Sequence, residues 1–249
     1  MSNVLLAGES WISNTYHTKG WDQFHSAVYD TGHKHLLAAL KTAGHDVTHM
    51  PGHAVGQDFP LDPAGLREFD VIILSDVGAN TILLHPDTWL HGKRTPNRLR
   101  LLRDYVHAGG GLLMAGGYMS FQGINGVARF RGTAVEQVLP VSIHPWDDRI
   151  EEPEGLEPVV VDAAHPLVEG IQGPWPSLLG INEVEVKHDG RLVVSAGGHP
   201  LLVAGEHGTG RSLAWTSDIG PHWCPPDFLA WPGYDRLWAN AIAWLAGEQ

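Results

Sequence analysis

The stretch GGGLLMAGGYMSFQG, Gly109–Gly123, decides how the rest of the sequence is interpreted. Its apolar run Leu112–Ala115 is typical of a buried strand, and the run breaks at Gly116 and Gly117. In α/β enzymes a strand that ends in such a tight turn often presents the catalytic nucleophile. Glycine occupies the corner here, so the pattern predicts an elbow without a Cys or Ser nucleophile.

Apolar runs alternate with amphipathic segments around this stretch. Asp70–Asp76 (DVIILSD) predicts a strand buried on both faces, and Asn97–His107 predicts a helix with Asn97 as its cap. This alternation is typical of a parallel, doubly wound α/β sheet with helices on both faces, in which ligands bind at the carboxyl ends of the strands. Further strands are expected at 4–7, 46–50 and 112–115, and further helices at 32–43 and 233–246.

The second half of the chain is richer in strand patterns and in Pro-containing loops. Residues 159–162 and 184–186 have valine-rich strand patterns, and 201–216 predicts a hairpin. We therefore expect one domain over residues 1–249, with β-rich additions at about 140–215.

Composition excludes several classes of protein. The net charge of −12, from 16 basic and 28 acidic residues, argues against nucleic-acid binding, which needs a basic face. One cysteine, Cys224, excludes an intramolecular disulfide and suits a reducing compartment. The first residues lack the basic start of a signal peptide, and no apolar run of about 18 residues exists. We expect a cytoplasmic protein with neither a nucleic-acid nor a membrane partner.

Three stretches carry a resemblance to a known group of proteins: VIILSDVGAN, GGGLLMAGGY and HGTGRSLAWTSDIGPHW. In this order they resemble the class I glutamine amidotransferase-like superfamily, close to its trehalose-utilisation-type branch. The whole sequence, including GESWISNTYHTKGWDQFHSA, is similar to a small bacterial family of this kind. The resemblance implies a flavodoxin-like sheet and a site at the elbow and a late loop.

The chain departs from the superfamily at the reacting atom. The superfamily's glutaminase attacks the amide with an elbow Cys, assisted by a His and a Glu from a late loop, and a glycine cannot replace a thiolate. Cys224 lies in the late loop instead, near His222, which corresponds to the superfamily's catalytic His. We therefore expect no glutaminase activity.

The segment 8–25 after the first strand is predicted to be a long polar and aromatic loop. Glu9 there is a candidate general base, and Trp11 a candidate stacking surface for a substrate. The alternative is that its aromatic side chains bind a neighbouring subunit of a homo-oligomer. His17 and His25, with Glu9, Asp22 or His222, suggest a metal site, but their eight-residue spacing does not favour one. No metal or other cofactor is therefore expected.

Other candidate side chains follow the later strands. Asp76 is expected to point into the cleft, and the backbone N–H groups of Gly117 and Tyr118 suggest an anion pocket at a helix start. In the late loop, His222 is a candidate acid or base, and Asp218 either orients it or caps the next turn. The predicted substrate-binding residues are Trp11, Asp76, Gly117, Tyr118, Ser120 and Asp218.

These observations favour a protein that binds or processes a small polar metabolite, such as a carbohydrate, at the strand ends. Any chemistry would be acid/base catalysis by Glu9 and His222. Two alternatives stay open: a non-catalytic oligomeric binding or assembly module, and, more weakly, a metal-dependent hydrolase that uses His17 and His25.

Overall fold

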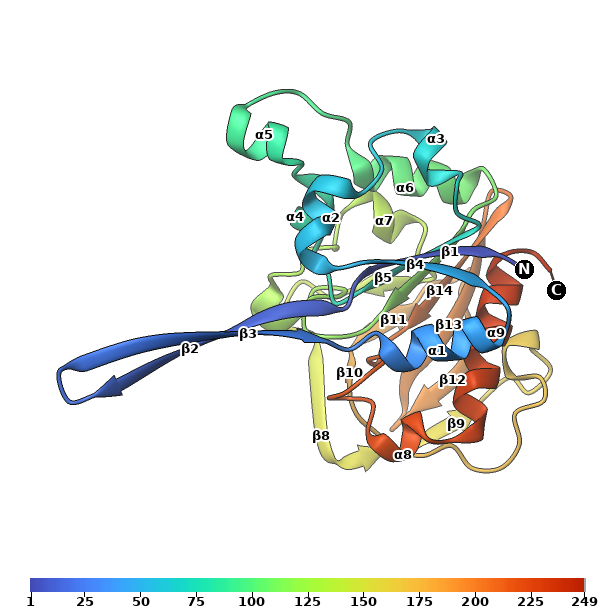
Figure 1. The fold of residues 1–249 in the computed structure, drawn as a ribbon. Coiled ribbons are helices and arrows are strands. Elements are labelled where there is room, and N and C mark those ends of the chain that lie inside the picture. Colours follow the sequence, from blue (N-terminus) through green and yellow to red (C-terminus); the bar gives the residue numbers. More distant parts are fainter. Residues whose placement is uncertain (249) are drawn as a thin grey trace.

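The computed structural model of the chain describes residues 1–248 and is built on a mixed eight-stranded sheet (Figure 1). Five neighbouring strands are parallel, and the remaining three continue the sheet in antiparallel fashion. From edge to edge the strands are β4 (Asp46–Met50), β1 (Asn3–Gly8), β5 (Val71–Ser75), β6 (Gly111–Ala115), β14 (Gly210–Trp215), β13 (His199–His207), β12 (Arg191–Ala196) and β9 (Pro158–Val160).

The central strands are buried on both faces because their side chains alternate between two cores. In β1, Val4 and Leu6 belong to one core, whereas Leu5 and Ala7 belong to the other. The helices divide in the same way, so they cover both faces of the sheet, as expected (Figure 1). One face carries α1 (Lys34–Thr42), α8 (Pro226–Leu229) and α9 (Pro232–Leu245); the other carries α2 (Gly52–Asp58), α3 (Pro63–Leu66), α4 (Ala79–Leu83), α6 (Arg98–His107) and α7 (Ala134–Gln137).

The sequence predictions for these elements are confirmed with small shifts at the ends. The α6 helix begins after Asn97, whose Oδ1 accepts a hydrogen bond from the Arg100 N–H at 3.1 Å. The hairpin predicted at 201–216 is formed by β13 and β14. The helix predicted at 233–246 is α9, which packs against α1.

The β-rich additions form two small sheets beside the main one. The strand β8 (Arg149–Leu156) pairs with β10 (Leu178–Asn182), and β7 (Val141–Ile143) pairs with β11 (Val184–Val186). The β8–β10 pair matters for the site, because both of its strands send side chains toward the turn after β6. Three short helices complete the elements: α5 (Pro86–His91), η1 (Ile124–Gly126) and η2 (Pro166–Val168).

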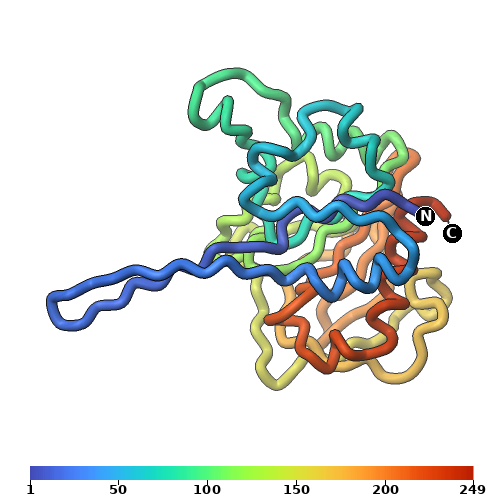
Figure 2. Tube along the Cα trace, in the orientation of Figure 1, coloured from blue at the N-terminus to red at the C-terminus, as the bar shows by residue number. Residues whose placement is uncertain are grey.

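The segment predicted as a loop after the first strand is a long β-hairpin that projects from the body (Figures 1 and 2). We call this hairpin, β2 (Ser10–Lys19) with β3 (Asp22–Thr31), the arm. Its strands pair without a break from Ser10–Thr31 to Lys19–Asp22, across a two-residue turn. The loop prediction was wrong because polar and apolar residues are mixed on both faces of the arm, so no apolar stripe marks it as a strand.

Candidate functional site

The site lies where four parallel strands end side by side. Gly8 of β1 is in register with Ser75 of β5, Ser75 with Ala115 of β6, and Ala115 with Trp215 of β14. The residues that follow these strands therefore meet at one edge of the sheet. Strand β4 lies on one side of β1 and β5 on the other, so the direction in which successive strands are added to the sheet switches at β1. Doubly wound sheets bind ligands at such a switch point.

Glu9 is a buried carboxyl of the site, with 1% of its surface exposed. Its Oε2 accepts a hydrogen bond from the Ser75 hydroxyl at 2.5 Å. A Cβ on Gly32 would lie 2.0 Å from its Oε1, so glycine at that position makes room for the carboxyl. Burial, together with the nearby Asp76, raises the pKa of Glu9 to about 7, against the hydrogen bond from Ser75. Near neutral pH this carboxyl is able both to give and to accept a proton.

Asp76 follows β5 directly, beside Glu9. Its Oδ1 accepts a hydrogen bond from the Met119 N–H at 2.7 Å, and its own N–H donates to the Ser120 hydroxyl at 3.1 Å. Burial raises its pKa, although the hydrogen bond from Met119 and the charge of His222 oppose the rise. Asp76 thereby ties the end of β5 to the turn after β6.

Glu9 and Asp76 both adopt left-handed backbone conformations, with φ of 53° and 47°. Non-glycine residues rarely adopt this region, and strained residues of this kind concentrate at functional sites. Here the conformation is held by the sheet, since the Glu9 N–H donates to the Ser75 carbonyl at 2.8 Å. Two adjacent strand ends therefore hold two carboxyl groups in strained positions.

Asp218 and His222 come from the loop after β14. Asp218 Oδ1 accepts a hydrogen bond from the Ile219 N–H at 2.8 Å, so this side chain caps its own turn. Its Oδ2 lies 3.8 Å from Nδ1 of His222, whose side chain is 54% exposed. Burial, and then the charges of Glu9 and Asp76, raise the pKa of Asp218 well above its ordinary value. The charge of Asp76 raises the pKa of Glu9, and the charges of both raise the pKa of Asp218, so ionisation of one carboxyl disfavours ionisation of the next.

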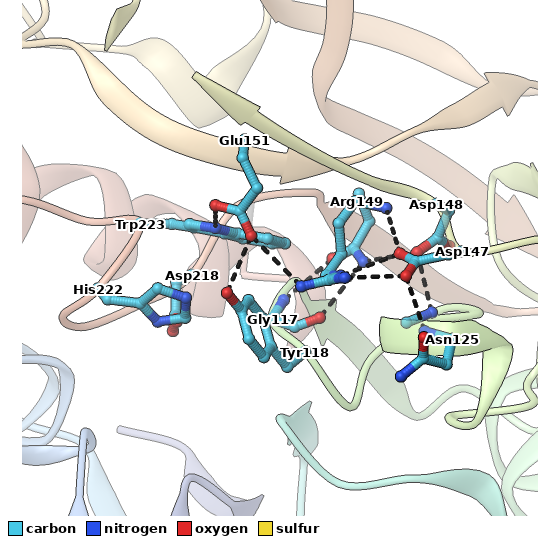
Figure 3. Close-up of polar contacts among 12 residues, drawn as sticks. Gly117, Tyr118, Asn125, Asp147, Asp148, Arg149, Glu151, Asp218, His222 and Trp223 are labelled. Carbon is cyan, nitrogen blue, oxygen red and sulfur yellow. Dashed lines mark hydrogen bonds and ion pairs between the residues drawn. The ribbon is translucent and has the colours of Figure 1, made fainter. Parts of the chain in front are cut away.

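Two aromatic side chains, Tyr118 and Trp223, form a wall beside His222 and Asp218 (Figure 3). The Tyr118 ring meets the His222 ring edge-on, with 4.6 Å between centroids, and its hydroxyl donates to Glu151 Oε1 at 3.0 Å. Trp223 Nε1 donates to the other oxygen of Glu151 at 2.9 Å. Arg149 lies over the Tyr118 ring at 4.6 Å and forms two hydrogen bonds with Asp147. Glu151 therefore fixes two aromatic rings beside the exposed imidazole.

Comparison with known proteins identifies the family. The model of the family described as "Putative glutamine amidotransferase" (GATase1-like) matches residues 3–247. The chain belongs to this family. No curated protein matches it.

Two solved structures resemble this GATase1-like chain over nearly their whole length. A cytoplasmic protein from Salmonella typhimurium is 41% identical, with a TM-score of 0.94, over 97% of this chain and 98% of that one. A second, from Salmonella typhimurium LT2, is 39% identical, also with a TM-score of 0.94, over 98% and 99%. A ThuA-like protein from Bacteroides uniformis shares the fold, with 11% identity and a TM-score of 0.50 over 95% and 90%.

The elbow of this GATase1-like chain has no room for a side chain at its corner. A Cβ on Gly116 would lie 2.2 Å from the Thr216 carbonyl oxygen and 2.8 Å from Asn182 Oδ1. Gly117 has φ of +140°, and a Cβ there would lie 2.9 Å from Asp76 Oδ1. Cys224 is fully buried, and burial raises the pKa of its thiol, so it is not a ready source of thiolate.

The backbone N–H groups of Gly116 and Gly117 are engaged within the chain, the first by the Trp215 carbonyl at 2.7 Å. The Gly117 N–H donates to Asn182 Oδ1 at 3.0 Å, and Asn182 Nδ2 donates to the buried Asp148 at 2.8 Å. Asp148 also accepts the N–H groups of Gln122 and Gly123. Residues 117–120 form a turn, so the helix start that was predicted here is wrong, whereas an anion pocket that uses the Tyr118 N–H stays a prediction.

The structure separates the predicted site residues into two groups. Glu9, Asp76, Gly117, Tyr118, Ser120, Asp218 and His222 lie at the strand ends, whereas Trp11, His17, Asp22 and His25 lie on the arm.

The two arm histidines do not share a face. His17 pairs with Phe24, and His25 pairs with the preceding Tyr16, so the two imidazoles project on opposite sides of the hairpin. Within residues 1–248 no three His, Cys, Asp or Glu side chains are arranged to hold a metal ion. The hypothesis of a metal site formed by His17 and His25 is therefore wrong.

Sequence reasoning missed Glu151 and Trp223. Trp223 adjoins His222 in a segment already rich in polar and aromatic residues, and that density was a usable signal. No sequence signal pointed to Glu151. It lies on β8, in the β-rich additions, and contacts Tyr118 only because β8 packs beside the turn after β6.

Proposed function

We propose that this chain is a GATase1-like protein without glutaminase activity, which binds and processes a small polar metabolite by acid/base chemistry. The observation that carries the proposal is Glu9, a buried carboxyl in a left-handed backbone conformation at the strand ends, with a pKa raised to about 7. Carboxyls tuned to neutral pH by burial are typical of general acids and bases.

The proposed roles follow from the positions of the groups. Glu9 exchanges a proton with the ligand, and His222, exposed at the rim and facing Asp218, exchanges the second. Asp76 and Asp218 accept hydrogen bonds from ligand hydroxyls, and the partly exposed Tyr118 ring, packed on the buried Trp223, covers the ligand's apolar face. Carboxyls next to aromatic rings suit a hydroxyl-rich ligand such as a carbohydrate.

Thiol chemistry is not part of this proposal. The crowding around Gly116 and the burial of Cys224 both argue against a glutaminase, whose nucleophile must be exposed at the elbow. The expected result is no ammonia release from glutamine above the level of the heat-denatured protein. Turnover abolished by Cys224→Ser would contradict this part of the proposal.

The ligand class is tested by thermal shift with sugars, polyols, amino acids and nucleotides. We expect hydroxyl-rich compounds to raise the melting temperature of the wild type and not that of His222→Ala. His188→Ala is the matched control, because the His188 side chain is 95% exposed away from the site. A ligand-induced rise in melting temperature that is as large in His222→Ala as in His188→Ala would contradict a site at His222. No rise in the wild type would contradict it as well.

Catalysis is tested separately from binding. With a bound ligand identified, product formation followed by NMR should stop in Glu9→Gln while ligand binding persists. Binding without turnover in the wild type would favour the alternative, a non-catalytic binding module, for which the exposed arm is the supporting observation.

We also propose a cytoplasmic location. The support is that the two solved structures about 40% identical to this chain are of cytoplasmic proteins. In residues 1–248 no helix has the length and apolar character needed to cross a membrane.

A further inference from the structure

The arm exposes almost all of its side chains. From Trp11 to Tyr29 every residue is exposed except the partly buried Ser13 and His17. Within residues 1–248, β2 and β3 pair only with each other, so the outer edge of each strand carries unpaired backbone groups. A two-stranded hairpin of this kind is marginally stable alone, and a long uncharged edge is prone to pair with another strand.

Both faces of the arm carry aromatic side chains. Tyr16 and Tyr29 lie on one face, and Trp11 and Phe24 on the other, with Trp21 at the turn. Their exposure runs from 39% for Trp11 to complete for Trp21. Since an aromatic side chain buries about 150–250 Å² when covered, the five offer on the order of 600 Å² of surface. A stable interface covers about 800 Å² on each partner, so the arm supplies most of one.

The charge of the arm identifies the partner. Lys19, Asp22 and Asp30 are its charged residues, a net of −1, whereas the chain as a whole carries −12. Two copies of so acidic a chain repel each other over most of their surface, and the arm is a long region where that repulsion is weak. The two strands also have equal length and unbroken register, so a second arm fits beside the first along its full length of roughly 34 Å.

We propose that the arm is a homodimerisation element, which packs against the arm of a second copy of this chain about a two-fold axis. Such an isologous contact uses the same surface on both copies and closes on itself. It covers, on each copy, the face or the strand edge of the arm through which the two arms meet, which the single chain leaves exposed. The inference does not depend on the proposed chemistry of Glu9.

The arm is also joined to the acid cluster. Ser10, the first residue of β2, follows Glu9 directly, and its hydroxyl accepts the Gly52 N–H at 2.7 Å. At the other end of the arm, the Gly32 N–H donates to the Glu9 carbonyl at 3.3 Å. Both ends of the arm therefore meet at Glu9, and dimerisation holds the backbone of that residue.

Sedimentation velocity on the full chain tests the proposal. We expect the wild type to sediment as a dimer or a larger closed assembly at micromolar concentration. Tyr16→Ser/Trp21→Ser/Phe24→Ser should raise the dissociation constant at least about 100-fold, because aromatic side chains dominate interface energies. The matched control is Trp89→Ser/Leu90→Ser/Trp146→Ser, which removes equally exposed apolar side chains outside the arm and should leave the assembly unchanged.

A second variant guards against misfolding of the triple variant. Replacing residues 14–27 with Asn-Gly closes a short hairpin between Ser13 and Val28, which already face each other. It should keep the cooperative thermal unfolding of the wild type and lose the assembly. A wild type that sediments as a single chain, or arm variants that keep the wild-type sedimentation coefficient, would overturn the proposal.

Discussion

Glu9 and Trp21 lie twelve residues apart in the sequence and at opposite extremes of exposure. Glu9 is enclosed by backbone and side chains from several strand ends, whereas Trp21 contributes its whole surface to solvent at the turn of the arm. Two segments that are close in the sequence therefore form two different parts of the molecular surface. The strand end forms a strained, acidic site, and the arm forms an exposed, aromatic surface of low charge.

The two regions are held in place by different interactions. The acid cluster is fixed by close backbone packing, so we expect even one added carbon atom to disturb it. The arm is fixed by its own ladder, so we expect changes to its side chains to leave the folding of a single chain unaffected. The variants below test this contrast, in order of decreasing effect on the free energy of unfolding.

The largest effect is expected for Gly116→Ala. Its methyl group would lie 2.2 Å from the Thr216 carbonyl oxygen, a backbone atom that moves only if β14 moves. We expect a loss of at least about 3 kcal/mol, at the upper end of the range for overpacked cores, measured by urea denaturation. Gly56→Ala in α2 is the control, since its nearest neighbour is 3.9 Å away, and it should be neutral or slightly stabilising.

The next largest effect is expected for Glu9→Gln, which should raise the free energy of unfolding rather than lower it. The folded pKa of Glu9 is raised from 4.5 to about 7, so the unfolded chain loses this proton first as pH rises. Stability is therefore complete below about pH 4.5 and falls between pH 4.5 and 7. Because glutamine does not ionise, the free energy of unfolding of the variant at pH 8 should exceed that of the wild type by on the order of 2–3 kcal/mol.

The pH dependence is the readout for Glu9. The stability difference between Glu9→Gln and the wild type should shrink as pH is lowered from 8 to 4, in urea titrations at each pH. Ser10→Ala, at the first residue of the arm, serves as a neighbouring control whose difference should not change with pH. A constant difference for Glu9→Gln would mean that its carboxyl is not buried in an unfavourable charged form.

A smaller effect is expected for Tyr118→Phe. The variant loses the hydroxyl that donates to Glu151 but keeps the ring beside His222. We expect a loss of about 0.5–1.5 kcal/mol, the net value of one hydrogen bond. Ligand-induced thermal shifts should fall more than stability does if Tyr118 lines the site, and unchanged shifts would remove it from the proposed wall.

The smallest effect is expected for Trp21→Ser. A fully exposed side chain contributes little to folding, so the free energy of unfolding should change by less than about 0.5 kcal/mol at low protein concentration. At high concentration the wild type should gain stability that the variant lacks, because assembly stabilises the folded chain. A large loss at low concentration would show that the arm packs on its own body.

The central sheet was predictable because its strands are buried on both faces. Runs such as Val71–Ser75 are continuous in apolar residues, and few other structures accommodate them. The arm was not predicted because its strands face solvent on both sides, and its alternation separates no core face from a polar one. Partner surfaces leave weaker patterns in sequence than cores do.

The site was predictable in part for a related reason. Glu9, Asp76 and His222 follow parallel strands, and the carboxyl ends of such strands share one edge, so order along the chain placed them together. Glu151 comes from an added strand whose docking depends on packing across the molecule. The backbone strain at Glu9 and Asp76 could not be predicted either, because no residue type other than glycine indicates a positive φ angle in a sequence.

The crowding at Gly116 also limits how this sequence can change. A Cys at position 116 would place its side chain where the Thr216 carbonyl already lies. The obstacle is main chain, so no second substitution at position 216 clears it, and the end of β14 must be rebuilt at the same time. A single substitution of Gly116 by Cys is therefore expected to destabilise the fold before it could supply a nucleophile.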